Sequence, residues 1–341
     1  MKKYILNETP VRTTNNYRIN NLEIELDIPK LTKTNNYIIN QDIDIEYAEK
    51  KGYNSKIGLE HNKYNSYTIN IEKNYKEPIL FDYEFKKENS VLIEEININM
   101  KEKKNANLIF RFKSKDKETN FHNVKFIINS EKDSKLNISI LNLLNENSKS
   151  FIAIENYQKE SSNNKINFID LGGNLRVSNY YNELLEENAI TNFNNIYIGT
   201  KEDRIDMNYY SKNIAPKTEG NIYVEGCIDD NSYKSFKGTI DFIKGCTNSK
   251  GIENENCIIL SDTCRTRSLP MLLCQEENVE GAHGVSSGKI DKDKLFYLMT
   301  RGLSEKESKR LIINANFSNI IKNIPIEEIK EEIINIINKK I

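Results

Sequence analysis

The sequence predicts a mainly β protein, built as a stacked solenoid or a large sandwich, with helices at its C-terminal end. Apolar and polar residues alternate in about a dozen short runs between residues 90 and 260, and a period of two indicates a strand with one buried face. The runs recur roughly every 12 to 16 residues, and no helical pattern separates them. Such spacing is typical of solenoids, sandwiches and barrels, whereas an alternating βαβ fold places helices between its strands. After Gly284 the apolar period becomes helical.

The expected strands start within a polar, turn-rich N-terminal region, residues 1–85, and continue through a β core at residues 86–280. Each run in the core contributes two or three apolar residues to one face. These residues are Ile96, Ile98 and Met100; Leu108, Phe110 and Phe112; Val124, Phe126 and Ile128; Leu136, Ile138 and Ile140; Ile152 and Ile154; Ile166 and Phe168; Ile196 and Ile198; Ile222 and Val224; Ile240 and Phe242; Ile258 and Leu260. The polar connectors and the lack of Asn-Gly and Asp-Gly hairpin pairs favour a parallel β-helix, although the periodicity alone is also compatible with a sandwich.

Residues 281–341 predict a helical domain. A loop is expected at residues 286–288, and Asp291 is placed to cap a helix that Gly302 ends. Ser304 and Glu307 form a capping box, in which the hydroxyl and the carboxylate satisfy free N–H groups. The helix that this box opens is expected to reach about Asn316.

A last helix is expected after Pro325, which fits the first turn because its missing N–H costs nothing there. Isoleucines at helical spacing give this helix one apolar stripe: Ile326, Ile329, Ile333, Ile336 and Ile337. A stripe of this kind either packs on the core of its own chain or docks a partner.

The charge balance excludes several function classes. Lys and Arg number 49 against 50 Asp and Glu, which gives a net charge of -1. General nucleic-acid binding rests on clustered Lys and Arg, so we expect no nucleic-acid partner. No stretch approaches 18 apolar residues, and the first residues contain no apolar run of signal length. We therefore expect a cytoplasmic protein with no membrane partner.

Common catalytic and nucleotide motifs are missing from the sequence. There is no GxxxxGK[ST] loop and no GxGxxG after a strand, so we expect no nucleotide to be bound by this chain. The patterns HExxH and CxxC are also absent. His61 and His122 lie in polar, strand-like settings, where surface or packing roles are expected.

The candidate site lies near the C-terminal end of the expected strands. His283 sits between small residues in the run VEGAHGVSSG, so its ring has little steric cover. Imidazole and thiolate are natural ligands of iron and of iron–sulfur clusters. Cys264 and Cys274 precede His283 by separations that a solenoid can stack on neighbouring turns. The alternatives are a hydrogen-bonded histidine at a strand-to-helix junction and cysteines that serve as small buried side chains.

At this stretch the sequence resembles the C-terminal signature of the SufB/SufD family, components of the SUF machinery that assembles iron–sulfur clusters. The segments that carry the resemblance are Val279, His283-Gly284, Gly288-Lys289-Ile290-Asp291, Leu295-Phe296-Tyr297-Leu298 and Arg301-Gly302-Leu303-Ser304-Glu305. Weaker similarity extends upstream, at residues 237–242 (KGTIDF) and at residues 7–13 (NETPVRT), which resemble a family strand and the start of the SufD branch.

The resemblance implies a right-handed parallel β-helix followed by a C-terminal helical domain. It further implies that residues 281–341 bind the ATPase SufC, and that the β-helix pairs with a SufB-type subunit or with a second copy of this chain. A transient iron–sulfur cluster or iron would form at that subunit interface and pass to apo iron–sulfur proteins. His283 falls on the SufD histidine of that interface, and the chain itself would be a non-catalytic scaffold.

Some positions depart from the SufB pattern. Ala282 and Gly284 flank the histidine where SufB has carboxylates. The position of the essential SufB cysteine holds Glu255 here, with Cys257 two residues away, and a SufD-type cysteine is replaced by Gly281. These departures favour a SufD-like subunit, and the alternative is a self-sufficient SufB-like scaffold that pairs with itself. A carbohydrate-active β-helix enzyme is disfavoured because the chain contains no Trp for sugar platforms and no signal segment is seen.

Overall fold

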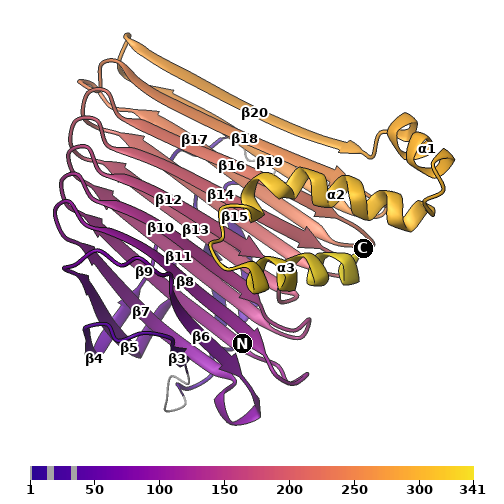
Figure 1. The fold of residues 1–341 in the computed structure, drawn as a ribbon, viewed down its shortest axis with the longest axis horizontal. Coiled ribbons are helices and arrows are strands. Elements are labelled where there is room, and N and C mark those ends of the chain that lie inside the picture. Colours follow the sequence, from indigo (N-terminus) through magenta and orange to yellow (C-terminus); the bar gives the residue numbers. More distant parts are fainter. Residues whose placement is uncertain (1, 14–18, 32–36) are drawn as a thin grey trace.

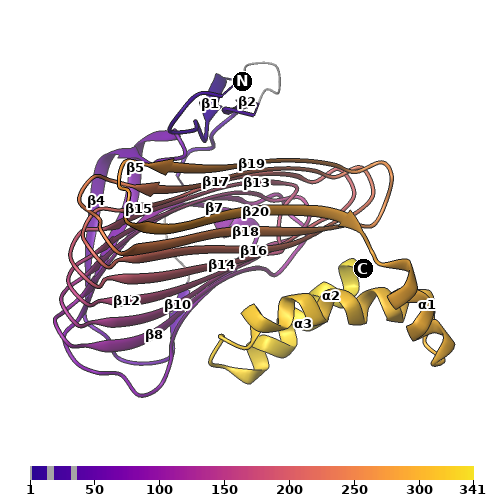
Figure 2. The same cartoon turned by 90° about the horizontal axis from the view of Figure 1, so that it is seen from above.

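The computed structural model describes residues 2–13, 19–31 and 37–341. The described chain is a parallel β-solenoid of about eight turns that ends in three α-helices (Figure 1). The prediction of a mainly β fold is therefore confirmed, and the choice between solenoid and sandwich is settled in favour of the solenoid. The solenoid has two long sheets, which lie face to face and enclose the core between them (Figure 2).

We call the first sheet the helix-covered sheet, because the C-terminal helices pack on its outer face. In spatial order it contains β20 (Val279–Lys289), β18 (Ser249–Ile259), β16 (Glu219–Ile228), β14 (Ile190–Gly199), β12 (Asn163–Asp170), β10 (Lys135–Leu143), β8 (Asn105–Ser114), β6 (Ile79–Phe85) and β3 (Tyr37–Ile39). All neighbouring strands in it are parallel except β3, which pairs antiparallel with β6.

We call the second sheet the hairpin-covered sheet, because an N-terminal hairpin packs on its outer face. In spatial order it contains β19 (Arg265–Cys274), β17 (Tyr233–Phe242), β15 (Arg204–Asn213), β13 (Leu175–Leu184), β11 (Lys149–Gln158), β9 (Phe121–Ser130), β7 (Val91–Met100), β5 (Glu60–Ile71) and β4 (Ile45–Asn54). The hairpin itself pairs β1 (Lys2–Leu6) with β2 (Leu22–Leu26) in antiparallel fashion.

The spacing of the apolar runs follows from the solenoid's geometry. Each half turn of the solenoid adds one strand, alternately to the two sheets. An apolar run therefore recurs after half a turn, and its register partner in the same sheet follows after a full turn. Ile152 pairs with Val124, for example, and His283 pairs with Glu253. Many of the loops that connect one sheet to the other contain one non-glycine residue with a positive φ, in the left-handed backbone conformation. Asp133, Asn188 and Asn248 are examples. Asn and Asp tolerate this conformation better than most residues, which explains why these loops need no Asn-Gly pairs.

The main core fills the lumen of the solenoid. It consists of inward-facing apolar side chains from both sheets, and aromatic rings stack along it from one turn to the next. The ring centroids of Phe81 and Phe110, on neighbouring turns, are 4.5 Å apart. Those of Tyr180 and Phe193, on opposite sheets, are 4.1 Å apart. Towards β18 and β20 the lumen becomes more polar, since Glu253 and Glu255 are fully buried there.

Two further apolar clusters lie outside the lumen. Leu141, Ile169 and Ile196 on the outer face of the helix-covered sheet contact α2 (Glu305–Ile321) and α3 (Glu327–Lys340) through residues such as Phe317 and Ile333. The isoleucine stripe of the last helix therefore packs on its own chain: Ile329, Ile333 and Ile337 are buried. On the other side, residues of β1 and β2 pack against outward-facing residues of β7, β9, β11 and β13.

The structure differs from the sequence-based boundaries at the C-terminal end. The last strand β20 runs through residues 281–289, which were assigned to the helical domain, and it includes residues 286–288, which were expected to form a loop. These small residues are extended because the whole strand pairs with β18. The first helix, α1 (Lys292–Thr300), starts after the expected cap Asp291, which accepts bonds from the backbone N–H groups of Asp293 and Lys294.

Smaller differences affect the other helices and the N-terminal region. The capping box of Ser304 and Glu307 is present, but α2 continues to Ile321 rather than Asn316 because its last turns are buried against the sheet. Pro325 lies just before α3, whose N-cap is Ile326. The solenoid also starts before residue 86, since β5 and β6 already pair in parallel with β7 and β8. In the described ranges, no helix is long and apolar enough to cross a membrane.

Candidate functional site

The C-terminal end of the solenoid is formed by β19 and β20, the last strands of the two sheets. Side chains at odd-numbered positions of β20 point into the lumen. A Cβ added to Gly281 would come within 2.9 Å of the Phe242 ring and 3.1 Å of Leu272, and Val285 packs against the lumen core. Because side chains alternate along a strand, His283 lies on the same lumen-facing side.

His283 is the fifth residue of β20 and is exposed, because no further turn covers it. Within the described residues its side chain makes no hydrogen bond. The ring therefore stands at the open end of the lumen with both nitrogens available to a ligand. The structure does not place it at a strand-to-helix junction, since six strand residues follow before the chain leaves the sheet.

Cys264 and Cys274 lie at opposite ends of β19. Cys264, just before the strand, is half-buried, and its Sγ lies 3.2 Å from the Ser261 carbonyl oxygen. Cys274, the last strand residue, is exposed, and its Sγ lies 3.0 Å from the Glu276 carbonyl oxygen. The ten-residue strand separates the two thiols by roughly 30 Å at ~3.3 Å per residue. The fold thus does not stack both cysteines beside His283.

A buried polar network lies in the lumen one turn below His283. The Glu255 carboxylate accepts hydrogen bonds from Lys234 Nζ at 2.5 Å, Ser268 Oγ at 2.7 Å and Tyr197 OH at 2.9 Å. Lys234 also donates to Ser268 Oγ at 2.8 Å. Lys234 and Glu255 are both fully buried, so the pair is held by mutual charge and by these extra hydrogen bonds.

Glu253 is two residues from Glu255 and points to the same side of β18. Its side chain is also fully buried, but neither carboxylate oxygen has a hydrogen-bond partner in the described chain. Burial and, to a lesser extent, the nearby Glu255 charge raise the pKa of Glu253 to about 8. Buried carboxylates are nearly always hydrogen-bonded or paired, so Glu253 is an exception at the open end of the lumen.

Cys257 completes the row of lumen-facing side chains on β18. It is 3% exposed, and burial raises its pKa to about 11. The thiol is therefore protonated at neutral pH and is a poor nucleophile as it stands. Its register partner on β20 is Ser287, which places it two lumen-facing positions along from His283.

Sequence reasoning missed the buried Glu253 and Lys234 and the half-buried Ser268. The signal was present in the run GIENENC, residues 251–257, where alternate positions hold Gly, Glu, Glu and Cys. Within this run Ile252 is 41% exposed, whereas Glu253 is fully buried. Polar residues at every second position of a strand-length run indicate a lumen that is polar in this turn.

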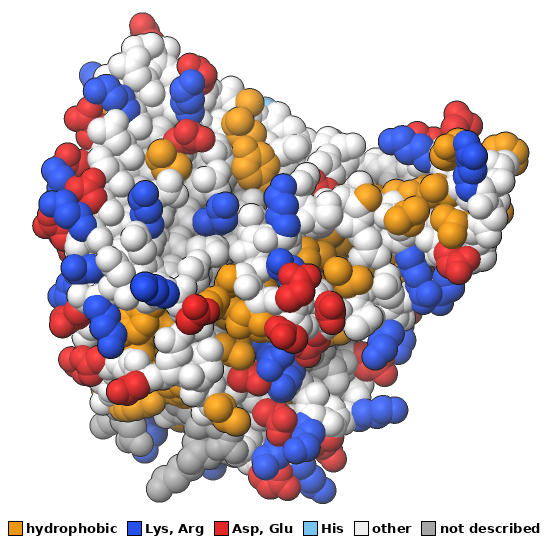
Figure 3. Space-filling view, viewed as in Figure 1, with side chains coloured by type: hydrophobic (Ala, Val, Ile, Leu, Met, Phe, Trp, Pro, Cys, Tyr) orange, Lys and Arg blue, Asp and Glu red, His pale blue; other side chains and the backbone are white. Residues whose placement is uncertain are grey.

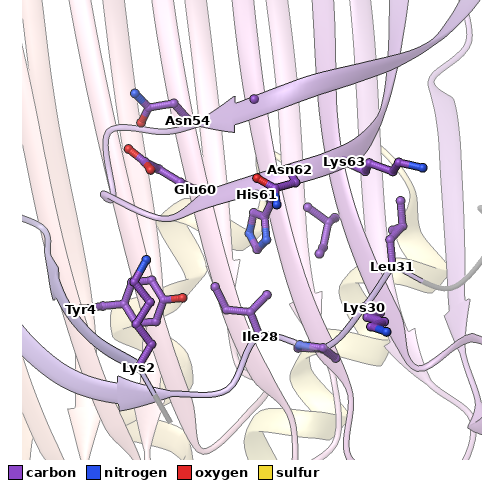
Figure 4. A pocket seen from close by; sticks show the side chains of 13 residues that line it. Lys2, Tyr4, Ile28, Lys30, Leu31, Asn54, Glu60, His61, Asn62 and Lys63 are labelled. Atoms are coloured by element: carbon purple, nitrogen blue, oxygen red, sulfur yellow. The ribbon is translucent and has the colours of Figure 1, made fainter.

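A separate pocket of about 850 Å³ lies at the other end of the solenoid, between the N-terminal hairpin and β4, β5 and β7 (Figure 4). His61 lines it, and burial lowers the pKa of His61 to about 4. His122 is fully buried in the lumen, where burial lowers its pKa to about 3. Both histidines are thus neutral packing residues at neutral pH, as the sequence predicted.

Two further observations concern metal ligands and partners. In the described part of the chain, no group of three or more His, Cys, Asp or Glu side chains is arranged to hold a metal ion.

Large apolar side chains are exposed on the helices, notably Phe296 at 69%, Tyr297 at 55% and Leu311 at 50%. Hydrophobic side chains gather where α1 projects from the solenoid (Figure 3).

The solenoid, the histidine at its open end and the helical ending agree with a match to a family model described as "SUF system FeS cluster assembly, SufBD core domain". This model matches residues 83–316, well over half of the chain. The chain belongs to the SufBD family. That family is described as part of the SUF system of iron–sulfur cluster assembly.

Curated relatives carry SufD or SufBD names. The chain is 26% identical to the iron–sulfur cluster assembly protein SufD of Bacillus subtilis over 146 residues, which is 43% of this chain and 33% of that protein. It is 30% identical to a SufBD family protein of Pyrococcus horikoshii over 145 residues, 42% of this chain and 32% of that protein. It is 21% identical to SufD of Escherichia coli over 245 residues, 72% of this chain and 58% of that protein. The matches thus span about a third to three fifths of these SufBD relatives.

Proposed function

We propose that this SufBD chain is a SufD-like scaffold subunit that works with a SufB-type subunit and the ATPase SufC. It supports the assembly of iron–sulfur clusters and their transfer to apo iron–sulfur proteins. The observation that carries the proposal is the position of His283. Its imidazole is exposed at the open end of a SufBD solenoid and has no hydrogen-bond partner in the described chain. In this role His283 binds iron or a nascent cluster, which is the cargo of the system rather than a resident cofactor.

The edges of β19 and β20 support pairing with a second subunit. In the described chain no strand pairs beyond β19 or β20, so both present unpaired N–H and C=O groups along strands of ten and eleven residues. Free edges of this kind bind strands of another chain. Such pairing puts His283 at the subunit interface, where a SufB-type partner supplies further ligands, among them a thiolate.

The exposed helix α1 and the N-terminal part of α2 support docking of SufC. Phe296, Tyr297 and Leu311 are exposed apolar side chains on these helices, and hydrophobic side chains gather where α1 projects from the solenoid (Figure 3). The rest of α2 and α3 is anchored on the helix-covered sheet. A movement of SufC during ATP hydrolysis is thereby transmitted through the helices to the sheet and its open end. Under this proposal the ATPase chemistry belongs to SufC, and this chain is non-catalytic.

The alternative is a self-sufficient SufB-like scaffold that pairs with a second copy and with SufC. The buried Cys257, next to the Glu255 network in the same lumen, is the observation in its favour. The raised pKa of this thiol and the place of Glu255 at the expected cysteine position favour the SufD-like role.

Co-purification followed by cluster reconstitution tests the proposal. The full chain is co-expressed with the organism's SufC and any SufB paralogue, and the complex receives iron and sulfide without oxygen. We expect a ternary complex whose cluster absorbance falls in His283→Ala and is unchanged in Ser286→Ala, a matched outward-facing position of the same strand. Cluster formation on a homodimer with SufC supports the alternative. No complex with SufC, or full absorbance in His283→Ala, overturns the proposal.

A further inference from the structure

Glu253 carries a buried carboxyl group for which the described fold provides no hydrogen-bond partner. Its neighbour Glu255 takes the hydrogen bonds of Lys234, Ser268 and Tyr197, so the nearest ammonium group is already paired. Both oxygens of Glu253 are without a partner, although the side chain is fully buried. Leaving such a group unsatisfied costs free energy, and this cost is recovered if a ligand binds the carboxylate.

The fold makes room for this carboxylate. A Cβ added to Gly238, on the opposite sheet, would come within 2.6 Å of Glu253 Cδ and 2.7 Å of its Cγ. The side chain therefore reaches across the lumen into space that a glycine leaves open. The fold thus leaves space for the Glu253 carboxyl group but gives it no hydrogen-bond partner in the described chain. A bound ligand explains this combination better than packing does.

Glu253 and His283 are register partners on the parallel strands β18 and β20. Register partners in a parallel sheet point to the same side, and neighbouring strands lie about 4.8 Å apart. An imidazole nitrogen and a carboxylate oxygen can therefore reach one metal ion, each at about 2.0 to 2.2 Å. His283 is at the solvent side and Glu253 is immediately below it, so an ion that enters past β20 meets the imidazole first.

We propose that Glu253 is a second ligand, beside His283, for a ferrous ion, so that this chain supplies a histidine–carboxylate pair. This inference rests on the proposed function, and it specifies the species that the subunit holds. Nitrogen and oxygen ligands suit Fe²⁺ as an ion, whereas preformed clusters are held mainly by thiolates. The remaining coordination positions are filled by the partner subunit, sulfide or water, which agrees with the absence of a three-ligand group in the described chain.

Binding of ferrous iron alone tests the pair directly. The full chain is titrated with Fe²⁺ under anaerobic conditions against a competing chelator, as wild type, Glu253→Gln, His283→Ala and the double variant. The matched control is Glu280→Gln, which removes an exposed carboxylate on the outward side of β20. We expect Glu253→Gln and His283→Ala each to weaken binding at least ten-fold, and Glu280→Gln to stay within two-fold of wild type.

The double variant shows whether the two residues hold the same ion. Two ligands of one ion are strongly coupled, so their losses of affinity do not multiply. The double variant is therefore expected to bind Fe²⁺ much more tightly than the product of the two single fold-losses implies. Purely multiplicative losses, or a Glu253→Gln affinity equal to wild type, overturn the inference. Glu253→Leu, which has no ligand atom and suits an apolar lumen, is expected to repeat the loss in a protein with an unchanged melting profile.

The outcome also separates this inference from the proposed function. If His283→Ala loses iron and cluster while Glu253→Gln keeps both, the inference fails and the scaffold function stands. If the complex with SufC does not form, the proposed function fails irrespective of the iron titration.

Discussion

The Lys237 ammonium lies 2.7 Å from Asp206 Oδ1, and both side chains are buried on the hairpin-covered sheet. The same carboxylate oxygen accepts a hydrogen bond from Asn7 Nδ2 at 2.8 Å, and Asn208 donates to the Glu8 carbonyl oxygen at 2.9 Å. The pair therefore does more than join β15 to β17, since it also fixes the N-terminal segment on the outer face of the solenoid.

Lys237→Ala is expected to destabilise the protein strongly. Removing one partner leaves the Asp206 charge buried and uncompensated, which costs about 3 to 5 kcal/mol in other proteins. Chemical denaturation measures the loss as a lower midpoint. The control Lys217→Ala breaks a pair with Glu187 in which both side chains are about half exposed, and such pairs contribute about 0 to 1 kcal/mol. Equal midpoints for the two variants would show that the buried pair adds no net stability.

The repeat of the solenoid could be predicted from the sequence, whereas its ends could not. Strand alternation at Ile96, Phe110 or Ile154 follows from burial of one face, and the structure places each of these side chains in the lumen. Towards the C-terminal end the same rule failed, because the expected pair Ile258 and Leu260 packs on the outer face beside the helices, whereas Glu253 and Glu255 are buried in the lumen. Alternation reports which residues share a face, but only the pairing of whole strands decides which face is inside.

The candidate site was predicted only in part for the same reason. His283 could be singled out because its neighbours are small and the surrounding motif is specific. Its register partner Glu253 is 30 residues away in the sequence, and nothing local connects the two. The thiols of Cys264 and Cys274 looked equivalent in sequence, and only the length of β19 shows that they lie at opposite ends of a strand.

The stability of the protein is expected to fall between pH 6.5 and 8 because of Glu94. This side chain is fully buried, and burial raises its pKa to about 8, against the hydrogen bond that Tyr83 OH donates to Oε2 at 2.9 Å. In this range the folded state holds a proton that the unfolded state has released, so the unfolded state binds fewer protons and stability falls as pH rises. The contribution of Glu94 to the free energy of unfolding is fully present below about pH 4.5, and it is lost as the pH rises to about 8.

The variant Glu94→Gln isolates this effect. One pKa unit corresponds to about 1.4 kcal/mol, so wild type is expected to lose up to about 2 kcal/mol relative to Glu94→Gln over this range. Urea midpoints at pH 6.5, 7.25 and 8 measure the difference. The buried His61 and His122, whose pKa values are lowered to about 4 and 3, act with the opposite sign and only below about pH 6.5. Parallel curves for the two proteins would mean that Glu94 does not titrate there.

Gly238→Ala is expected to cost about 1 to 3 kcal/mol, the usual range for overpacking a filled interior. The new methyl group would collide with Glu253 Cδ and lie within 2.8 Å of the Phe236 ring, so one of them must move. Thermal melting measures the loss. The control Gly288→Ala adds a methyl group with no atom within 4 Å and is expected to stay within about 0.5 kcal/mol of wild type. If the two alanine variants melt together, the space beside Glu253 is not tailored as the structure indicates.

Phe296→Asp is expected to weaken binding of SufC without unfolding the protein. Phe296 is 69% exposed on α1, so its replacement removes few internal contacts, yet it places a charge on the part of α1 that is proposed to contact SufC. Buried aromatic anchors dominate many interfaces, and their loss costs about 2 kcal/mol or more, which is a 30-fold or greater loss of affinity. The control Ile38→Asp changes a residue that is 75% exposed on β3, at the far end of the solenoid. Surface plasmon resonance with immobilised SufC compares the two variants. Equal affinities for both would move the SufC surface away from α1, and a loss in both would indicate a broader contact along the solenoid.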